Sequence, residues 1–240
     1  MTLAVVIPAY EAARHVALVI ERVLAAPLPE LDRIIVVDDG SRDETGRLVA
    51  ALPRARCPID LVTRPRNGGY GAAMKDGLAR AAETDPDVVA CVHADGQYSP
   101  EALPGLLTTL RSRRLDLLQG SRVASGTALS GGMPLYKYVA NAALNLLENW
   151  TLGLRMTDYH SGYLLYGRRA RQAISFARLS DSFDFDLEVI ASARAAGLNV
   201  AEAPVPTHYG DEHSHLRPIP YGMRVLRVLW RFRRGHYDPA

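Results

Sequence analysis

Three residues whose side chains can bind a metal ion occur at alternate positions just after the apolar run 88–92: His93, Asp95 and Gln97. On an extended segment, side chains two positions apart project to the same side, so all three can face one ion. An imidazole, a carboxylate and an amide oxygen suit Mn²⁺ or Mg²⁺, whose coordination phosphate oxygens commonly complete. The pattern predicts a metal site for a phosphorylated ligand, although Asp95 alone is also typical of a helix cap.

Other polar segments also follow apolar runs that are typical of buried strands. They are Pro8–Glu11, Asp38–Asp39 and Gly120–Arg122. In an open parallel sheet, ligands bind outside the carboxyl ends of the strands. One such segment is equally typical of a turn, but several at one edge of one sheet indicate a ligand site there.

The elements that must position these residues follow from an alternation of short apolar runs and helix-like patterns. This alternation predicts a single α/β domain with a mainly parallel sheet flanked by helices. Ser41 with Glu44 three residues later is a capping-box pattern, which predicts a helix start at Ser41. The expected strands are 3–7, 33–37, 59–63, 88–92, 115–118 and 199–205; the expected helices are 15–25, 41–52, 72–83, one opening at 99, 135–152, 185–196 and 220–234.

The composition is that of an ordinary globular protein. Of its 240 residues, 28 are Lys or Arg and 26 are Asp or Glu, and the net charge of +2 predicts no nucleic-acid binding. Cys57 and Cys91 lack a metal-type spacing and are expected to be reduced thiols. No basic signal-peptide region occurs at the N-terminus and no apolar stretch approaches about 20 residues, so we expect a cytoplasmic protein.

The motifs together resemble the family 2 glycosyltransferases with the GT-A fold. The segments that carry the resemblance are Ile7–Glu11, Val36–Thr45, Ala94–Gln97, Gly120–Arg122 and Asp158–Tyr163. The spacing is most similar to the polyprenyl (dolichyl or undecaprenyl) phosphate mannosyl- and glucosyltransferases. The resemblance implies a Rossmann-like GT-A domain over 1–216, with a nucleotide-binding half at about 1–122 and an acceptor-side half at 123–216. Residues 217–240 would follow as a basic amphipathic helix.

The same resemblance implies a nucleotide diphosphate sugar as donor, linked to UDP, GDP or dTDP. Pro8, Tyr10 and Glu11 would line the nucleoside pocket, with the Tyr10 ring against the base or ribose. Asp39 would hydrogen-bond the base, and Asp38 would support its loop.

Further positions would contact the donor. Gly69 and Gly71 would let the backbone approach the nucleotide closely. Ala94 would contact the donor as well, and Arg122 would supply a fixed positive charge for phosphate.

Two positions depart from the pattern of the resembling family. Its metal motif is typically Asp-x-Asp, and His93 replaces the first acid, so Asp95, Gln97 and His93 are expected to hold Mn²⁺ or Mg²⁺. A neutral His93 that donates a hydrogen bond beside the metal is the alternative. The relatives also often carry a Ser-Lys pair late in the domain, where His215 would make the substrate contact here in a pH-dependent way.

The activity that follows is an inverting transfer, with Asp95 catalytic through the metal and a polyprenyl phosphate as the favoured acceptor. A phosphate monoester is already anionic near neutral pH and needs little help from a base. A hydroxyl acceptor requires a carboxylate to take its proton; Asp158 is the first candidate, followed by Asp184 and Asp186. A soluble sugar or small-molecule acceptor, and a non-catalytic nucleotide-sugar-binding protein, are the open alternatives.

Two C-terminal features each have two interpretations. The polar segment 208–215 is either a surface loop or a lid over the donor. The stripe of Arg224, Arg227, Arg231 and Arg234 either rests on the inner face of a membrane or lies in water while the helix packs on the core.

Overall fold

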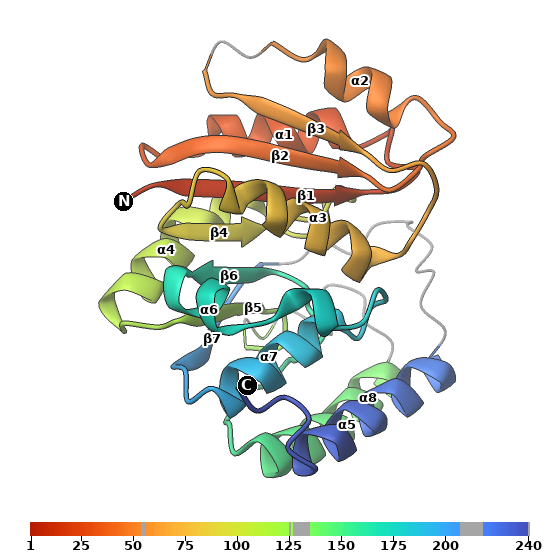
Figure 1. The fold of residues 1–240 in the computed structure, drawn as a ribbon, viewed down its shortest axis with the longest axis vertical. Helices are drawn as coiled ribbons and strands as arrows, with labels where there is room; N and C mark the ends of the chain where they lie inside the picture. Colours follow the sequence, from red (N-terminus) through yellow and green to blue (C-terminus); the bar gives the residue numbers. More distant parts are fainter. Residues whose placement is uncertain (54–55, 125, 127–134, 207–217, 240) are drawn as a thin grey trace.

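The computed structural model describes residues 1–53, 56–124, 126, 135–206 and 218–239, which form one α/β domain around a seven-stranded sheet (Figure 1). The strands are β1 (Leu3–Ala9), β2 (Leu31–Asp38), β3 (Ile59–Thr63), β4 (Val88–Cys91), β5 (Leu117–Ser121), β6 (Leu164–Gly167) and β7 (Val200–Pro204). Their order is β3-β2-β1-β4-β6-β5-β7. Only β6 runs against the other described strands, pairing antiparallel with β4 and β5. The expected α/β class and mainly parallel sheet are confirmed.

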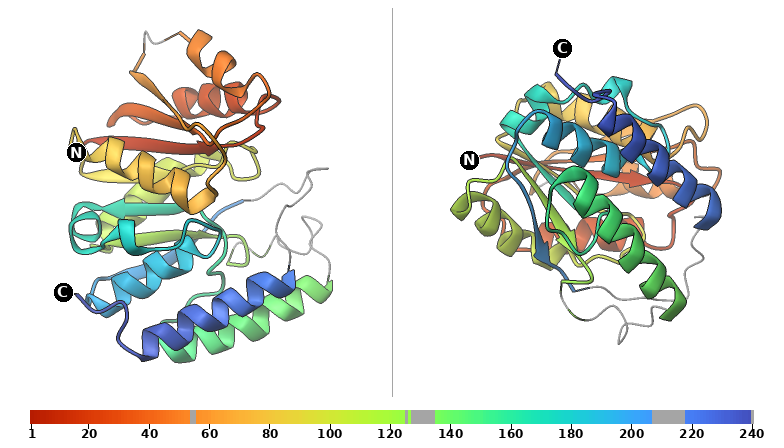
Figure 2. Two further views of the ribbon diagram at one scale, coloured as in Figure 1. Left: turned by 45° about the vertical axis from the view of Figure 1, so that its right-hand side comes forward. Right: turned by 90° about the horizontal axis from the view of Figure 1, so that it is seen from below.

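Helical segments cover both faces of the sheet (Figures 1 and 2). They are α1 (Val16–Ala25), α2 (Thr45–Ala51), α3 (Tyr70–Ala82), η1 (Pro100–Ala102), α4 (Leu103–Ser112), α5 (Leu135–Leu152), α6 (Arg168–Ala173), η2 (Phe176–Arg178), α7 (Phe185–Ala195) and α8 (Pro218–Arg233). Side chains alternate along β1, so that Val5 and Ile7 join the core with α1 and α4, whereas Ala4 and Val6 join the core with α3 and α7. Both faces of the central strands are therefore buried.

Strands β5 and β6 differ from the sequence-based expectation. β6 was not predicted, because a strand of four residues gives little periodicity. β5 was expected over 115–118 and continues to Ser121, through Gln119 and Gly120, which are buried although polar or small. The Gln119 amide Nε2 donates to the Asp158 carbonyl at 2.6 Å, which satisfies the buried donor.

The helix expected from Ser41 begins at Thr45 instead. Ser41 Oγ accepts the backbone N–H of Glu11 at 3.0 Å rather than capping a helix. The Asp43 carboxylate accepts the backbone N–H of Thr45 at 3.0 Å and that of Ala13 at 3.0 Å. The capping-box prediction is thus wrong, because these side chains join the loop after β1 to the loop after β2.

Two arginines of the expected stripe, Arg224 and Arg231, lie beside α7. Val225 is fully buried in the core, and Arg224 and Arg231 lie 3.2 and 3.3 Å from the carboxylates of Asp184 and Glu188. α8 therefore packs on the core, as one of the two interpretations expected, and the side chains of Arg224 and Arg231 stay 50% and 30% exposed while they pair with these acids.

A different, apolar face of α8 is exposed beside α5, and the two helices run side by side at one end of the molecule (Figure 2). We call this surface the α5–α8 face. Its exposed residues are Leu146 and Trp150 of α5 and Met223, Leu226 and Trp230 of α8. None of the helices over the described ranges is long and apolar enough to cross a bilayer.

Candidate active site

The polar segments predicted to share one sheet edge do share it. β1, β2, β4 and β5 run in the same direction, so the segments that begin at Tyr10, Asp39, Val92 and Arg122 all leave the sheet at that edge. Because β6 is antiparallel, the segment 158–163 that precedes it reaches the same edge. The topology therefore assembles one site from five separate segments.

Asp39 organises the loop that follows β3. Its carboxylate is 3% exposed and accepts the backbone N–H groups of Gly68 and Gly69 at 2.9 and 2.8 Å, and it pairs with the Arg64 guanidinium at 2.8 Å. Asp38 is also buried and accepts the N–H of Ser41 at 2.9 Å. The two acids hold adjacent loops in place, and three donors fix the orientation of the Asp39 carboxylate.

The segment after β1 presents Tyr10 at the surface and uses Glu11 as a link. The Tyr10 side chain is 43% exposed. Glu11 has φ +50°, and its carboxylate accepts the Arg42 N–H at 2.7 Å while its own N–H donates to Ser41. Pro8 is the penultimate residue of β1 and sets where this segment leaves the sheet.

Gly69 and Gly71 allow a close approach within the chain itself. A Cβ at Gly69 would lie 2.4 Å from the carbonyl oxygen of Asp181, and one at Gly71 would lie 2.3 Å from that of Ser180. Gly69 also has φ +100°, which residues with a side chain rarely adopt. The contact that these glycines permit in the structure is therefore with the segment 180–182, which no sequence pattern placed beside this loop.

The segment 93–97 turns rather than running straight. Ala94 and Asp95 form a turn, Gly96 has φ +74°, and the Asp95 carboxylate accepts the backbone N–H of Gln97 at 3.0 Å. The premise that residues 93, 95 and 97 alternate on an extended segment is therefore wrong. Asp95 and Gln97 still lie together, because the turn joins them.

His93 is packed between two aromatic rings. The centroids of Tyr70 and Tyr98 lie 5.4 and 5.5 Å from that of its imidazole, and Nε2 lies 3.3 Å from the Gly162 carbonyl oxygen. Burial lowers the pKa of His93, with Asp95 opposing the effect, so the ring is neutral near pH 7. A neutral ring that donates Nε2–H to Gly162 has Nδ1 as its remaining ligand atom. This geometry favours the hydrogen-bond-donor interpretation of His93.

The residues at this edge fit a metal ion that arrives with a diphosphate. Asp95 supplies a carboxylate and Gln97 an amide, and over the described ranges no cluster of three or more His, Cys, Asp or Glu forms a metal site of its own. Mg²⁺ is commonly held by one or two carboxylates together with substrate phosphates and water. The donor set therefore matches Mg²⁺ or Mn²⁺ completed by phosphate oxygens.

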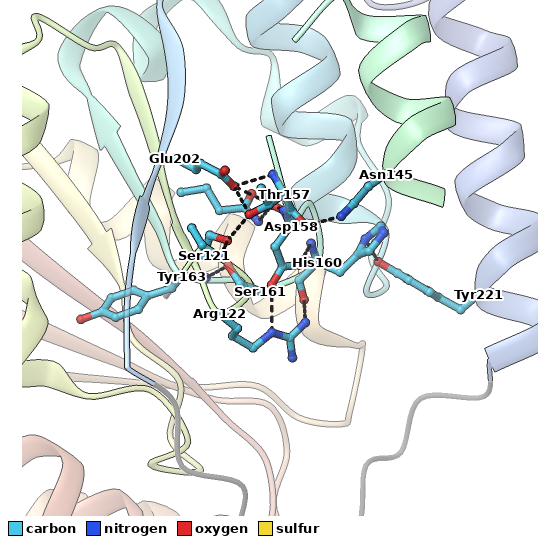
Figure 3. A network of polar contacts seen from close by, with 12 residues as sticks. Ser121, Arg122, Asn145, Thr157, Asp158, His160, Ser161, Tyr163, Glu202 and Tyr221 are labelled. Atoms are coloured by element: carbon cyan, nitrogen blue, oxygen red, sulfur yellow. Dashed lines mark hydrogen bonds and ion pairs between the residues drawn. The ribbon is translucent and has the colours of Figure 1, made fainter. Parts of the chain in front are cut away.

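Arg122 is fixed by Asp158 at the end of β5 (Figure 3). Its Nε donates to Oδ2 of Asp158 at 2.9 Å, and its guanidinium also reaches the His160 carbonyl at 3.4 Å. Burial raises the pKa of the Asp158 carboxyl, but the adjacent Arg122 outweighs burial and holds that pKa below its usual value. Both carboxylate oxygens are engaged, since Oδ1 accepts the His160 N–H at 2.9 Å. This arrangement suits the positioning of Arg122 better than the removal of a proton.

A buried polar network continues from this pair into the helices (Figure 3). His160 Nε2 lies 3.2 Å from the carboxylate of Glu148, which is fully buried on α5. His160 Nδ1 lies 2.8 Å from the Tyr221 hydroxyl on α8. Sequence patterns singled out neither Glu148 nor Tyr221. The available signal was an acid, Glu148, at an apolar position of the expected helix 135–152, since buried acids are rare unless paired.

The remaining acid candidates lie on and before α7. Asp184 accepts the Ser180 hydroxyl at 2.8 Å and pairs with Arg224, so it holds a loop to a helix. Burial raises the pKa of Asp186 to about 7, and its Oδ1 accepts the Tyr70 hydroxyl at 3.1 Å. A Cβ at Gly162 would contact both His93 and Asp186, so these two side chains approach each other there. His215 and the segment 208–215 lie outside the described residues.

Residues 4–174 match the family described as "Glycosyl transferase family 2". Across 95% of its length the chain is 32% identical to the low-salt glycan biosynthesis hexosyltransferase Agl6 of Haloferax volcanii, and it spans about half, 53%, of that protein. It is 30% identical to the polyprenol monophosphomannose synthase of Mycolicibacterium smegmatis, covering 84% of this chain and 75% of that one.

The fold is also shared with a solved structure. Glucosyl-3-phosphoglycerate synthase of Mycobacterium tuberculosis, in complex with Mn²⁺, uridine diphosphate and glucosyl-3-phosphoglycerate, superposes with a TM-score of 0.69. Its identity to this chain is 18%, over 100% of this chain and 81% of that one. This likeness establishes the common fold.

Proposed function

Because the chain belongs to glycosyl transferase family 2, we propose that it moves a sugar, with inversion, from a nucleotide diphosphate sugar to a polyprenyl phosphate. The observation that carries this proposal is the arrangement at the sheet edge. Asp39 follows β2, Asp95 follows β4, and Arg122 follows β5, where Asp158 fixes its guanidinium. Asp39 would contact the nucleoside, Asp95 would bind the metal on the diphosphate, and Arg122 would stabilise the negative charge of the leaving diphosphate.

The donor lies across this edge from the first to the fifth strand in chain order. The nucleoside occupies the side of Pro8, Tyr10 and Asp39, where the exposed Tyr10 ring is available to the base or ribose. Glu11 and Asp38 hold the loops that surround it. UDP, GDP and dTDP are the donor nucleotides to test, since the contacts named here are common to all three.

Asp95 and Gln97 hold Mn²⁺ or Mg²⁺ on the diphosphate, and Ala94 lies in the same turn beside it. When bound, the ion supplies positive charge to the leaving diphosphate. His93 joins the start of this turn to the segment 158–163 through its hydrogen bond to the Gly162 carbonyl. The solved relative whose complex contains Mn²⁺ and uridine diphosphate supports the metal assignment.

The chain contributes electrostatics and orientation to the reaction. Negative charge develops on the diphosphate as the bond to the sugar breaks, and Arg122 stabilises that charge from a fixed position. The acceptor phosphate attacks from the opposite face and inverts the anomeric centre. A phosphate oxygen is already anionic, so no general base is needed, which agrees with the engagement of both Asp158 oxygens by Arg122 and His160.

A lipid acceptor requires contact with a membrane, and we assign this contact to the α5–α8 face. Trp150 and Trp230 are 69% and 59% exposed there. The guanidiniums of Arg233 and Arg234 lie 3.8 and 5.0 Å from the ring centroids of Trp150 and Trp230. Aromatic and basic residues on one amphipathic surface suit the interface of an anionic bilayer. Peripheral binding to the cytoplasmic leaflet follows from this assignment.

A soluble phosphorylated acceptor is the second candidate. It is favoured by the solved relative, whose complex contains glucosyl-3-phosphoglycerate. Such an acceptor would use the same donor site and metal, but it would not need the α5–α8 face.

The test is a thermal-shift screen of UDP-, GDP- and dTDP-linked sugars with and without Mn²⁺, followed by transfer assays. The stabilising donor is incubated with undecaprenyl phosphate in vesicles, and separately with 3-phosphoglycerate and simple sugars. We expect transfer to undecaprenyl phosphate and no transfer to 3-phosphoglycerate or to the simple sugars. Transfer only to a soluble compound would replace the lipid acceptor, and donor binding without any transfer or hydrolysis would favour a non-catalytic binding protein.

A further inference from the structure

The network behind Arg122 contains a fully buried carboxylate whose charged partner is a histidine. Glu148 has no exposed surface, and the nearest charged group among the described residues is the His160 imidazole, 3.2 Å away. A buried, unpaired charge costs several kcal/mol, so such a carboxylate needs a positive partner. The buried position of Glu148 on α5 therefore favours a positively charged His160.

The charges around His160 balance when the imidazole carries a proton on both nitrogens. Arg122 and His160 then contribute two positive charges against the two negative charges of Asp158 and Glu148. Asp186 of α7 is the further acid that faces this ring, and burial raises its pKa to about 7, so it carries only part of a charge at neutral pH. A neutral His160 would leave a net negative charge in a buried place.

The environment of the ring acts in the same direction. Burial lowers the pKa of His160, but Glu148 and Asp158 outweigh burial and the repulsion from Arg122, and the net pKa is raised above 6.5. From α8 the group that meets the ring is the Tyr221 hydroxyl, which lies 2.8 Å from Nδ1 and can accept a hydrogen bond from Nδ1–H.

His160 is directly connected to the site at the sheet edge. Its backbone N–H donates to Asp158 Oδ1 at 2.9 Å, and its carbonyl lies 3.4 Å from the Arg122 guanidinium. One residue therefore contacts α5 and α8 with its side chain and the Arg122–Asp158 pair with its backbone (Figure 3).

We propose that His160 is a positioning residue, whose imidazolium joins Glu148 of α5 and Tyr221 of α8 to the loop that aims Arg122 at the donor diphosphate. This rests on the proposed function, since it assigns the diphosphate to Arg122. The two helices that carry the α5–α8 face are thereby tied to the donor site through a single ring. The pair Glu148–His160 strengthens donor binding at low and neutral pH, and this contribution disappears as the pH rises through the raised pKa of His160.

The test measures the dissociation constant of UDP and of GDP with Mn²⁺, for the wild type and for His160→Gln, Glu148→Gln and Tyr221→Phe. At pH 7, His160→Gln should weaken binding of the nucleotide that the wild type binds by about tenfold, a coupling typical of residues in one polar network. Tyr221→Phe should weaken it about threefold, as for one lost hydrogen bond. His236→Gln, at an exposed histidine after α8, is the matched control and should bind as the wild type does.

The pH dependence separates positioning from simple packing. The ratio of the His160→Gln and wild-type dissociation constants cancels the titration of the ligand itself. That ratio should fall towards one as the pH rises above 6.5, because the wild type then loses its imidazolium. Glu148→Gln removes the acid that raises the pKa of His160. In this background the ratio of the dissociation constants with and without His160→Gln should fall at a lower pH.

A double-mutant cycle tests the route through Arg122. In an Arg122→Ala background, His160→Gln should have no further effect on nucleotide binding. Equal binding by wild type and by folded His160→Gln or Tyr221→Phe, a ratio that is flat from pH 6 to 9, or an undiminished effect without Arg122 would each overturn the inference. Failure of the wild type to bind any nucleoside diphosphate with Mn²⁺ would instead overturn the proposed donor site.

Discussion

The donor-side loops and the surroundings of Arg122 lie at one sheet edge but are held by different means. On the donor side, the carboxylates of Asp38, Asp39 and Glu11 accept backbone N–H groups of neighbouring loops. Around Arg122, buried charged side chains from the end of β5, the segment 158–160 and α5 pair with one another. Acid-to-backbone contacts tolerate changes elsewhere in the domain, whereas a buried charge network fails when one member is lost. The first region is built from contacts between loops, and the second joins the end of β5 to the segment 158–160 and to α5 and α8.

The largest effect is expected at Asp95, on the donor side. Asp95→Asn should lower transfer at least about 100-fold, because a bound metal supplies several kcal/mol of charge stabilisation. The measurement is the turnover number as a function of Mn²⁺ concentration. Asp32→Asn, at the start of β2 and 45% exposed in its side chain, is the control. Transfer by Asp95→Asn with an unchanged Mn²⁺ requirement would remove this residue from the metal site.

A substitution at Asp158 tests the surroundings of Arg122. Asp158→Asn should raise the KM for the donor about 30-fold, or about 2 kcal/mol, because a hydrogen bond to a charged group is lost and Arg122 is released. Added formate should restore none of the activity. A fall in turnover with unchanged KM, rescued by formate, would instead identify Asp158 as a general base and favour a hydroxyl acceptor.

A substitution at Gly71 tests how tightly the loop after β3 packs on the segment 180–182. Gly71→Ala places a Cβ 2.3 Å from the Ser180 carbonyl oxygen, and we expect a loss of about 1–3 kcal/mol in the free energy of unfolding. Each kcal/mol corresponds to roughly 2–4 °C in Tm for a chain of this size. Gly105→Ala in α4, where a Cβ meets nothing within 4 Å, is the matched control and should raise Tm slightly. Equal Tm values for the two variants would show that the loop has room to relax.

The smallest effect is expected on the α5–α8 face. Trp150→Ala combined with Trp230→Ala should weaken binding to vesicles that contain anionic lipid by about tenfold, or about 1.4 kcal/mol of lost apolar contact. Binding of the nucleotide with Mn²⁺ should stay as in the wild type, since neither ring touches the donor loops. Leu18→Ala, at an exposed leucine of α1, serves as the control. Vesicle binding that survives the double substitution would remove this face from the membrane contact.

Much of the donor side was predictable because its information is local. Short apolar runs stopped by polar segments placed Asp39, Asp95 and Arg122 at carboxyl ends of parallel strands, and the topology confirms the shared edge. The resemblance on the same motifs named the family, which the match over residues 4–174 confirms. The capping box at Ser41 was wrong because the hydroxyl accepts the backbone N–H of Glu11 from another loop. The extended geometry at His93 was wrong because Ala94 and Asp95 form a turn in which Asp95 accepts the Gln97 N–H.

The sequence by itself determined the fold class, the family and the strand ends at which the chemistry lies, since each depends on periodicity and motifs within a few residues. Tertiary structure alone decided that Asp158 pairs with Arg122, that Arg224 and Arg231 of α8 pair with Asp184 and Glu188, and that Glu148 meets His160. These contacts join residues distant in the sequence, and their energies depend on burial and charge balance. Neither quantity exists until the helices have packed.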